Sequence, residues 1–231
     1  MSNDIFKFRQ FNVCQDFDGM KVGSDGVMLG AWAKGGNRIL DVGTGTGLIA
    51  LMMSQRFPNA EVLAIDISED AFAQAGRNVA NSKFADRIEV RHISFQDLSV
   101  ANRFDAIVTN PPFFIDSLKN PNQTRNLARH TDMLSYSDLF HSAKRLLTNE
   151  GCLSAIIPSD YKDRFVQEAS ICGFFISRMY GIKTVERKPV KRYLLEFKLK
   201  RSDIIEAKTF TMMTHDERSE WYNNLVSEFY L

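Results

Sequence analysis

Short runs of branched apolar residues alternate along this chain with longer stretches in which apolar residues recur at helical spacing. A near-continuous apolar run predicts a strand buried on both faces, and the helical period predicts a helix with one buried face. Strands are therefore expected over 38–42, 61–66, 88–91, 104–108, 152–157, 174–179 and 193–199. Helices are expected over 48–57 and 68–81, from Ser137 as an N-cap to about Leu147 with Gly151 as a later stop, across Phe165 to Cys172, and over 215–230. This alternation predicts an α/β fold: a doubly wound parallel sheet with helices on both faces.

No repeat, low-complexity tract or linker divides the sequence, so we expect a single domain over 1–231. An N-terminal segment (1–36) precedes the alternation, a core (37–200) contains it, and a C-terminal segment (201–231) is expected to hold a further strand and a helix. Apolar residues form one stripe along that last helix, which predicts packing against the domain. They are Trp221, Leu225, Val226 and Phe229.

The composition, 44 % apolar and 25 % charged, is ordinary for a globular protein. The 29 basic residues nearly balance the 28 acidic ones, and the net charge of +1 excludes a uniformly basic nucleic-acid coat while leaving local basic patches open. No apolar run approaches the roughly 18 residues of a membrane span, and the start lacks the apolar core of a secretory signal. A soluble, cytoplasmic protein is expected.

The three cysteines have no CxxC spacing, which argues against a disulfide framework and against a cysteine zinc site. The four histidines also lack the spacing typical of metal ligands. No metal is expected, and nothing in the sequence indicates an obligate protein partner.

The first chemical signal follows the first predicted strand, where Asp41 precedes glycines at alternate positions, Gly43, Gly45 and Gly47, with Thr44 between the first two. Such glycines let the backbone turn tightly and approach a ligand without Cβ clashes. Dinucleotide-binding enzymes also place glycines here, but with the spacing G-x-G-x-x-G. An acid before the loop would repel a pyrophosphate, whereas it suits a cationic group such as an ammonium. The loop therefore argues against a nicotinamide dehydrogenase.

Further candidate residues follow the next two strands. Asp66 ends the second strand, about twenty residues after the first glycine, where a carboxylate accepts both ribose hydroxyls of a bound nucleoside. Asp97 follows the third strand and is equally well explained as a turn residue or as a partner of an adenine amino group. Their neighbours Ile67 and Gln96 complete the candidate nucleoside site.

The glycine loop and the acids after it resemble the class I S-adenosylmethionine-dependent methyltransferases over about 38–200. The resemblance implies a Rossmann-like sheet of seven strands whose last strand is antiparallel, with S-adenosylmethionine over the ends of strands one and two. It also implies that Asp41 and the loop meet the methionine part, Asp66 the ribose and Asp97 the adenine.

The fourth predicted strand ends in Asn110, Pro111, Pro112 and Phe113. In a doubly wound sheet this strand neighbours the first, so the tetrapeptide is expected across the crevice from the glycine loop. Prolines lack N–H donors, so the loop presents carbonyl acceptors beside the Asn110 side-chain oxygen. Two such acceptors match the two N–H donors of an exocyclic amine and favour its pyramidalisation toward a methyl donor. Phe113 is suited to stack on the substrate ring.

This tetrapeptide resembles the amino-methyltransferase signature, which implies transfer to adenine N6, guanine N2 or a glutamine amide. A closer resemblance is to the bacterial tRNA(Val) adenine-N6 methyltransferase family. It is carried by 20–32, Arg125, 128–130 and 229–231. It implies methylation of the adenine just 3′ of the anticodon, and a segment over the cofactor that includes Lys21, Asp25 and the residues between them.

Basic residues gather at two places despite the neutral total. Arg125, Arg129 and His130 follow the Asn-Pro-Pro-Phe loop, and Lys188 and Arg192 lie between the last two strands. Loops at a substrate-facing edge favour phosphate contact over a merely solvated face. A single-stranded anticodon-loop base also enters a pocket at low unstacking cost.

The sequence therefore predicts S-adenosylmethionine-dependent N6-methylation of a tRNA adenine. A ribosomal RNA guanine-N2 methyltransferase and a non-catalytic scaffold that binds S-adenosylmethionine or RNA remain as alternatives.

Overall fold

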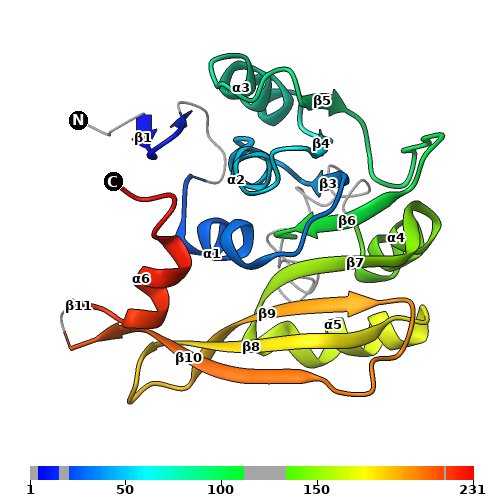
Figure 1. Ribbon diagram of the computed structural model, residues 1–231. Coiled ribbons are helices and arrows are strands. Elements are labelled where there is room, and N and C mark those ends of the chain that lie inside the picture. The colour runs from blue at the N-terminus through cyan, green and yellow to red at the C-terminus, as the bar shows by residue number, and fades with distance from the viewer. Residues whose placement is uncertain (1–4, 16–20, 112–133, 216) are drawn as a thin grey trace, which may run out of the picture.

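The computed structural model describes residues 5–15, 21–111, 134–215 and 217–231 of the chain. Its central feature is a nine-stranded sheet with the order β11-β10-β8-β9-β7-β6-β3-β4-β5 (Figure 1). The strands are β3 (Arg38–Val42), β4 (Glu61–Asp66), β5 (Ile88–His92), β6 (Phe104–Thr109), β7 (Leu147–Pro158), β8 (Phe175–Val185), β9 (Val190–Lys198), β10 (Glu206–Thr214) and β11 (Glu217–Arg218).

The predicted doubly wound α/β fold is confirmed. Strand β9, the last of the seven expected core strands, runs antiparallel to both β7 and β8, and β3 to β7 pair in parallel. The sheet has more strands than the seven expected for the core, because the further strand expected in the C-terminal segment joins it as β10. In the described part of the chain β10 pairs in parallel with β8, and β11 pairs with β10. The C-terminal segment thus extends the sheet at the edge where the core alone would end.

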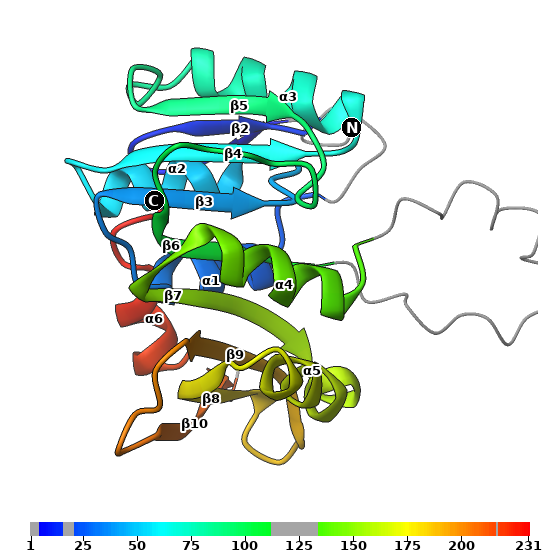
Figure 2. The same ribbon diagram turned by 90° about the vertical axis from the view of Figure 1, so that its right-hand side faces the viewer.

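Helices cover both faces of the sheet, as predicted (Figure 1, Figure 2). One face carries α4 (Tyr136–Leu146) and α5 (Ser159–Ile171). The other carries α1 (Ser24–Trp32), α2 (Leu48–Arg56), α3 (Glu69–Ala80) and α6 (Glu220–Val226), with the hairpin of β1 (Ile5–Lys7) and β2 (Asn12–Cys14). Each face has its own apolar core, so the sheet is buried between two layers.

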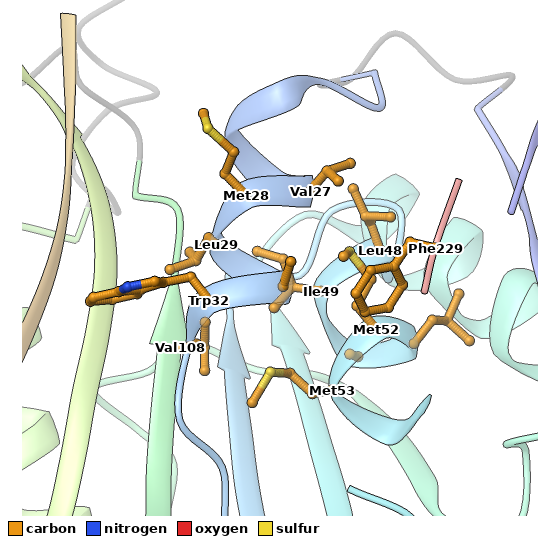
Figure 3. Close-up of a cluster of buried hydrophobic side chains, with 14 of the residues drawn as sticks. Val27, Met28, Leu29, Trp32, Leu48, Ile49, Met52, Met53, Val108 and Phe229 are labelled. Atoms are coloured by element: carbon orange, nitrogen blue, oxygen red, sulfur yellow. The ribbon is translucent and has the colours of Figure 1, made fainter. Parts of the chain in front are cut away.

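The packing of α1 on α2 depends on two glycines four residues apart on α1. A Cβ on Gly30 would lie 2.8 Å from the sulfur of Met52, and one on Gly26 would lie 3.1 Å from Leu48. The absent side chains let the two helices approach closely, and the apolar residues around them close the contact (Figure 3). This contact fixes the position of α1, whose first residues line the cavity described below.

Some element boundaries differ from those predicted. The N-cap of α4 is Ser135, whose hydroxyl accepts the N–H of Asp138, whereas Ser137 lies in the first turn. Gly151 lies within β7 and stops no helix. The last helix covers only Glu220–Val226, and Ser219 caps it. Ser135 and Ser137 are equally good N-caps by residue type, so the sequence cannot choose between them, and tertiary packing selects Ser135.

Candidate active site

A cavity of about 760 Å³ opens at the carboxyl ends of β3, β4 and β6. This is the topological switch point of the sheet, because the chain runs outward from β3 through β4 to β5 and then returns to β6 on the other side of β3. Predicted site residues gather in its wall. They are Lys21, Asp25, Gly43, Thr44, Gly45, Asp66, Ile67, Gln96, Asn110, Pro111 and Arg192.

The glycine loop adopts a conformation that requires glycine. Gly43 and Gly45 have φ angles of 69° and 57°, and a Cβ on either would have no atom within 4 Å. Open space therefore lies in front of the loop, where a bound group can reach the backbone. The N–H groups of Gly43 and Thr44 both donate to the carbonyl of Ile65, which ties the loop to the end of β4.

Asp41 lies beneath this loop and not in the cavity wall. It is fully buried, and its Oδ2 accepts hydrogen bonds from the Thr44 hydroxyl at 2.6 Å and from the Ala50 N–H at 3.1 Å. Its Oδ1 has no hydrogen-bond partner among the described residues. Burial raises the pKa of this carboxyl from 3.8 to about 7. Asp41 therefore holds the loop from below through these hydrogen bonds. The sequence had predicted direct contact with a ligand, but Asp41 does not line the cavity.

Asp66 supports the loop from the side. Its Oδ2 accepts the N–H of Gly45 and its Oδ1 accepts the N–H of Ser68, both at 2.9 Å. A carboxylate oxygen accepts more than one hydrogen bond, so both oxygens can still accept hydroxyl groups from the cavity. The next residue, Ile67, exposes 49 % of its surface at the cavity and offers an apolar face beside those acceptors.

Two other predicted residues lie outside the cavity wall. Gly47 has a φ of 81° and caps α2, and a Cβ there would lie 3.4 Å from Ala75 of α3. The Asp97 side chain accepts a hydrogen bond from the hydroxyl of Ser94 at 2.6 Å, and the backbone N–H of Asp97 donates to the same hydroxyl oxygen. Of the two explanations for Asp97, the structure favours the turn residue, while its neighbour Gln96 lines the cavity.

Asn110 and Pro111 line the cavity directly after β6. Thr109 pairs with Val42 in the sheet register, and its hydroxyl donates to the Val42 carbonyl at 3.0 Å. The next residues of the two strands, Asn110 and Gly43, therefore stand side by side at the sheet edge. The remaining predicted residues of this region lie outside the described residues. They are Pro112, Phe113, Arg125, Arg129 and His130.

The second wall of the cavity contains an ion pair between distant parts of the chain. Arg192 Nε, at the start of β9, lies 2.7 Å from Asp25 Oδ2 in the first turn of α1. Sequence analysis assigned these residues to RNA and to the cofactor respectively, and the structure brings them together. Lys188 is exposed in the turn between β8 and β9 and does not line the cavity.

Sequence reasoning missed several wall residues. Ser94 and Phe95 follow β5 and precede Gln96, so the rule that ligands bind after the strands would have found them. Leu134 has no such signal, because it lies far along the chain from any strand end.

Among the described residues, no three His, Cys, Asp or Glu side chains are grouped to hold a metal ion. In the same part of the chain, no helix is both long and apolar enough to cross a membrane.

Comparison with known proteins adds independent information. The family model of the methyltransferase small domain matches residues 22–170. A protein of Phocaeicola vulgatus named tRNA1(Val) (adenine(37)-N6)-methyltransferase is 47% identical over 100% of this chain and 99% of its own length. Proteins of the same name from Bacteroides thetaiotaomicron and Vibrio campbellii are 43% and 39% identical, over 100% and 98% of this chain and 99% and 95% of their own lengths.

Solved structures of lower identity share the fold. A predicted O-methyltransferase from Agrobacterium tumefaciens matches with a TM-score of 0.66 at 18% identity, over 88% of this chain and 96% of that one. The glycopeptide N-methyltransferase MtfA in complex with S-adenosylmethionine matches with a TM-score of 0.57 at 12% identity, over 76% of this chain and 95% of that one.

The burial of Asp41 predicts how stability depends on pH. The folded carboxyl keeps its proton up to a pKa of about 7, whereas the unfolded one releases it near 3.8. The free energy of unfolding is therefore highest, as far as Asp41 contributes to it, below about pH 4. It falls as the pH rises through 7, because the unfolded carboxyl releases its proton first. Asp41→Asn keeps an acceptor oxygen for Thr44 but does not titrate, so urea unfolding at pH 5 and pH 8 should show a smaller loss of stability in the variant than in the wild type. Equal losses would contradict this.

Proposed function

The chain belongs to the methyltransferase small-domain family and to the group of relatives named tRNA1(Val) (adenine(37)-N6)-methyltransferase, and we propose that it transfers a methyl group from S-adenosylmethionine to N6 of an adenine in tRNA. The adenine proposed is the one just 3′ of the anticodon of tRNA1(Val). The observation that carries this proposal is the placement of Asn110 beside the glycine loop in the cavity that Asp66 also lines.

The residues of the cavity fit S-adenosylmethionine. The open space before Gly43 and Gly45 suits a group that lies against the backbone, and we assign the methionine part to it. The Asp66 carboxylate suits the ribose hydroxyls, and the exposed face of Ile67 suits an adenine ring, with Gln96 nearby. When bound, S-adenosylmethionine supplies an electrophilic methyl group on a sulfonium.

Asn110 and the backbone after it would orient the base that is methylated. The lone pair of an exocyclic amine is delocalised into the ring, so the amine is a weak nucleophile. Hydrogen bonds from its two N–H groups to the Asn110 side-chain oxygen and to a loop carbonyl draw electron density onto nitrogen and aim its lone pair. Pro111 cannot donate a backbone N–H, so its position adds no competing donor. The methylated amine then loses one proton and becomes neutral.

The RNA is proposed to lie along the basic turn between β8 and β9. Lys188 is exposed in this turn and Lys191 at the start of β9, both close in sequence to the cavity residue Arg192. Arg192 pairs with Asp25, so we assign it to the cavity wall and not to RNA contact. Contacts of Arg125, Arg129 and His130 with RNA phosphates stay predictions from the sequence. A tRNA substrate also agrees with a cytoplasmic location.

Replacing Asn110 should slow the reaction without weakening cofactor binding. Asn110→Ala is expected to lower kcat by on the order of 10²–10³, as the loss of one oriented polar contact does in other enzymes. Nucleoside mass spectrometry of tRNA incubated with labelled S-adenosylmethionine measures the product, and calorimetry measures cofactor affinity. With the wild-type protein, label in N2-methylguanosine in place of N6-methyladenosine would contradict the adenine proposal. If the wild type binds the cofactor but labels no tRNA, a tRNA substrate is refuted, and ribosomal RNA tested in the same way separates the guanine alternative from the scaffold.

Replacing Asp66 should weaken the cofactor. Asp66→Ala removes hydrogen bonds from a charged acceptor, so the affinity for S-adenosylmethionine should fall by about 1.5–3 kcal/mol. Asp97→Ala is a matched control, because Asp97 also follows a strand of this sheet but lies outside the cavity wall. Calorimetry should show little change for the control. Similar losses for both variants would refute the assignment of the ribose to Asp66.

The basic turn should supply RNA affinity through phosphate contacts. Each contact releases condensed counterions, so the double variant Lys188→Ala/Lys191→Ala should flatten the log–log salt dependence of tRNA binding by about 1.4–1.8 units. Lys83→Ala is the control, since Lys83 is exposed in the turn before β5, at the opposite edge of the sheet. An unchanged slope in the double variant would place both lysines on a solvated face.

A further inference from the structure

Asn78 on α3 is a polar residue with only 2 % of its surface exposed. Its Nδ2 donates to the carbonyl of Thr46 at 2.8 Å and to the carbonyl of Cys14 at 2.9 Å, and its Oδ1 accepts the N–H of Cys14 at 2.9 Å. Both donor hydrogens of the amide are thus used, and the side chain pairs with the Cys14 backbone much as a neighbouring strand would. A buried amide is stable only with such partners, and here they come from two separate segments.

One of the two segments lines the cavity, and the other is linked to residues that do. Thr46 belongs to the glycine loop and lines the cavity. Cys14 ends β2, and the side chain of the next residue, Gln15, accepts the N–H of Val22 at 2.8 Å. Val22 lies between Lys21 and Gly23, which line the cavity. Asn78 itself does not line the cavity: it contacts the wall residue Thr46 directly, and it is linked to the segment of Lys21 and Gly23 only through Cys14, Gln15 and Val22.

Gln74, one helical turn before Asn78, binds the same strand without reaching the loop. It is fully buried, and its Nε2 donates to the Cys14 carbonyl at 3.0 Å. The two side chains therefore share one partner and differ in the other, because only Asn78 holds Thr46. Replacing Gln74 therefore weakens only the contact with the N-terminal strand, whereas replacing Asn78 also removes the contact with the glycine loop.

We propose that Asn78 is a positioning residue that holds the glycine loop against the N-terminal strand, so that the two walls of the S-adenosylmethionine cavity form together. This inference rests on the proposed function. Thr46 is 4 % exposed, and without Asn78 its carbonyl would be left buried without that donor. The loop would relieve this by turning, which moves Gly45 and Thr46 relative to a bound cofactor. The cost falls on cofactor affinity, because Asn78 lies away from the position of the methylated base.

The test compares Asn78→Ala with Gln74→Ala in the full chain. Calorimetry should show that Asn78→Ala raises the Kd for S-adenosylmethionine and for S-adenosylhomocysteine by about tenfold, the equivalent of one or two lost hydrogen bonds. The kcat at saturating cofactor should stay within about threefold of the wild-type value. Gln74→Ala should keep the Kd within about twofold of the wild-type value, although urea unfolding should show that this variant also loses stability.

A second measurement follows the link between the walls directly. Cofactor binding should slow hydrogen exchange at the Cys14 amide in the wild type and in Gln74→Ala, and should leave it unchanged in Asn78→Ala. Should Asn78→Ala fail to fold, Asn78→Asp takes its place, because it keeps the acceptor for the Cys14 N–H and removes the donors to the Thr46 and Cys14 carbonyls.

The outcomes separate this inference from the proposed function. If the wild type does not bind S-adenosylmethionine, both are wrong. If the wild type binds it and the Asn78 variants bind it equally well, or if Kd rises in both the Asn78 and Gln74 variants in step with lost stability, only the role of Asn78 is overturned.

Discussion

The site depends on a backbone conformation that few residues adopt. Gly43 and Gly45 hold the loop after β3 in the left-handed region, and side chains around the loop keep it there. Asp41 binds it from below, Asp66 from the side and Asn78 from behind. Because these contacts use groups of the protein itself, the loop is organised before a ligand arrives, and binding has less backbone entropy to remove.

The charges around the cavity are distributed unevenly, although the whole chain is nearly neutral. The carboxylate of Asp66 lies beside the glycine loop, whereas burial raises the pKa of Asp41 beneath the loop to about 7. The other wall carries Lys21 and the pair of Arg192 with Asp25. A ligand with a cationic centre and an anionic end suits such a cavity, and S-adenosylmethionine has both. The basic residues before Arg192 that we propose to contact RNA phosphates leave the whole surface nearly neutral.

The second wall is held in place by packing between the ends of the chain. Gly26 and Gly30 let α1 sit closely on α2, and Phe229 joins the same apolar cluster (Figure 3). The N–H of Arg9 donates to the Phe229 carbonyl, which ties the N-terminal hairpin to the last residues of the chain. Substitutions at either end of the chain can therefore change the shape of the cavity by shifting α1, even when the substituted residue does not contact a ligand.

Local patterns in the sequence predicted the core strands from Arg38 to Lys198 and the order of the chemistry along them, because strands buried on both faces must be apolar and ligands bind where such strands end. Which way each side chain points was decided only in the folded structure. Asp41 lies near the end of the first expected strand and Asp97 follows the third, yet their hydrogen bonds to Thr44 and Ser94 hold them away from the cavity wall. The pair of Arg192 with Asp25 and the bonds of Asn78 join residues far apart in the sequence, and no local pattern records a contact that exists only after the sheet and helices have packed.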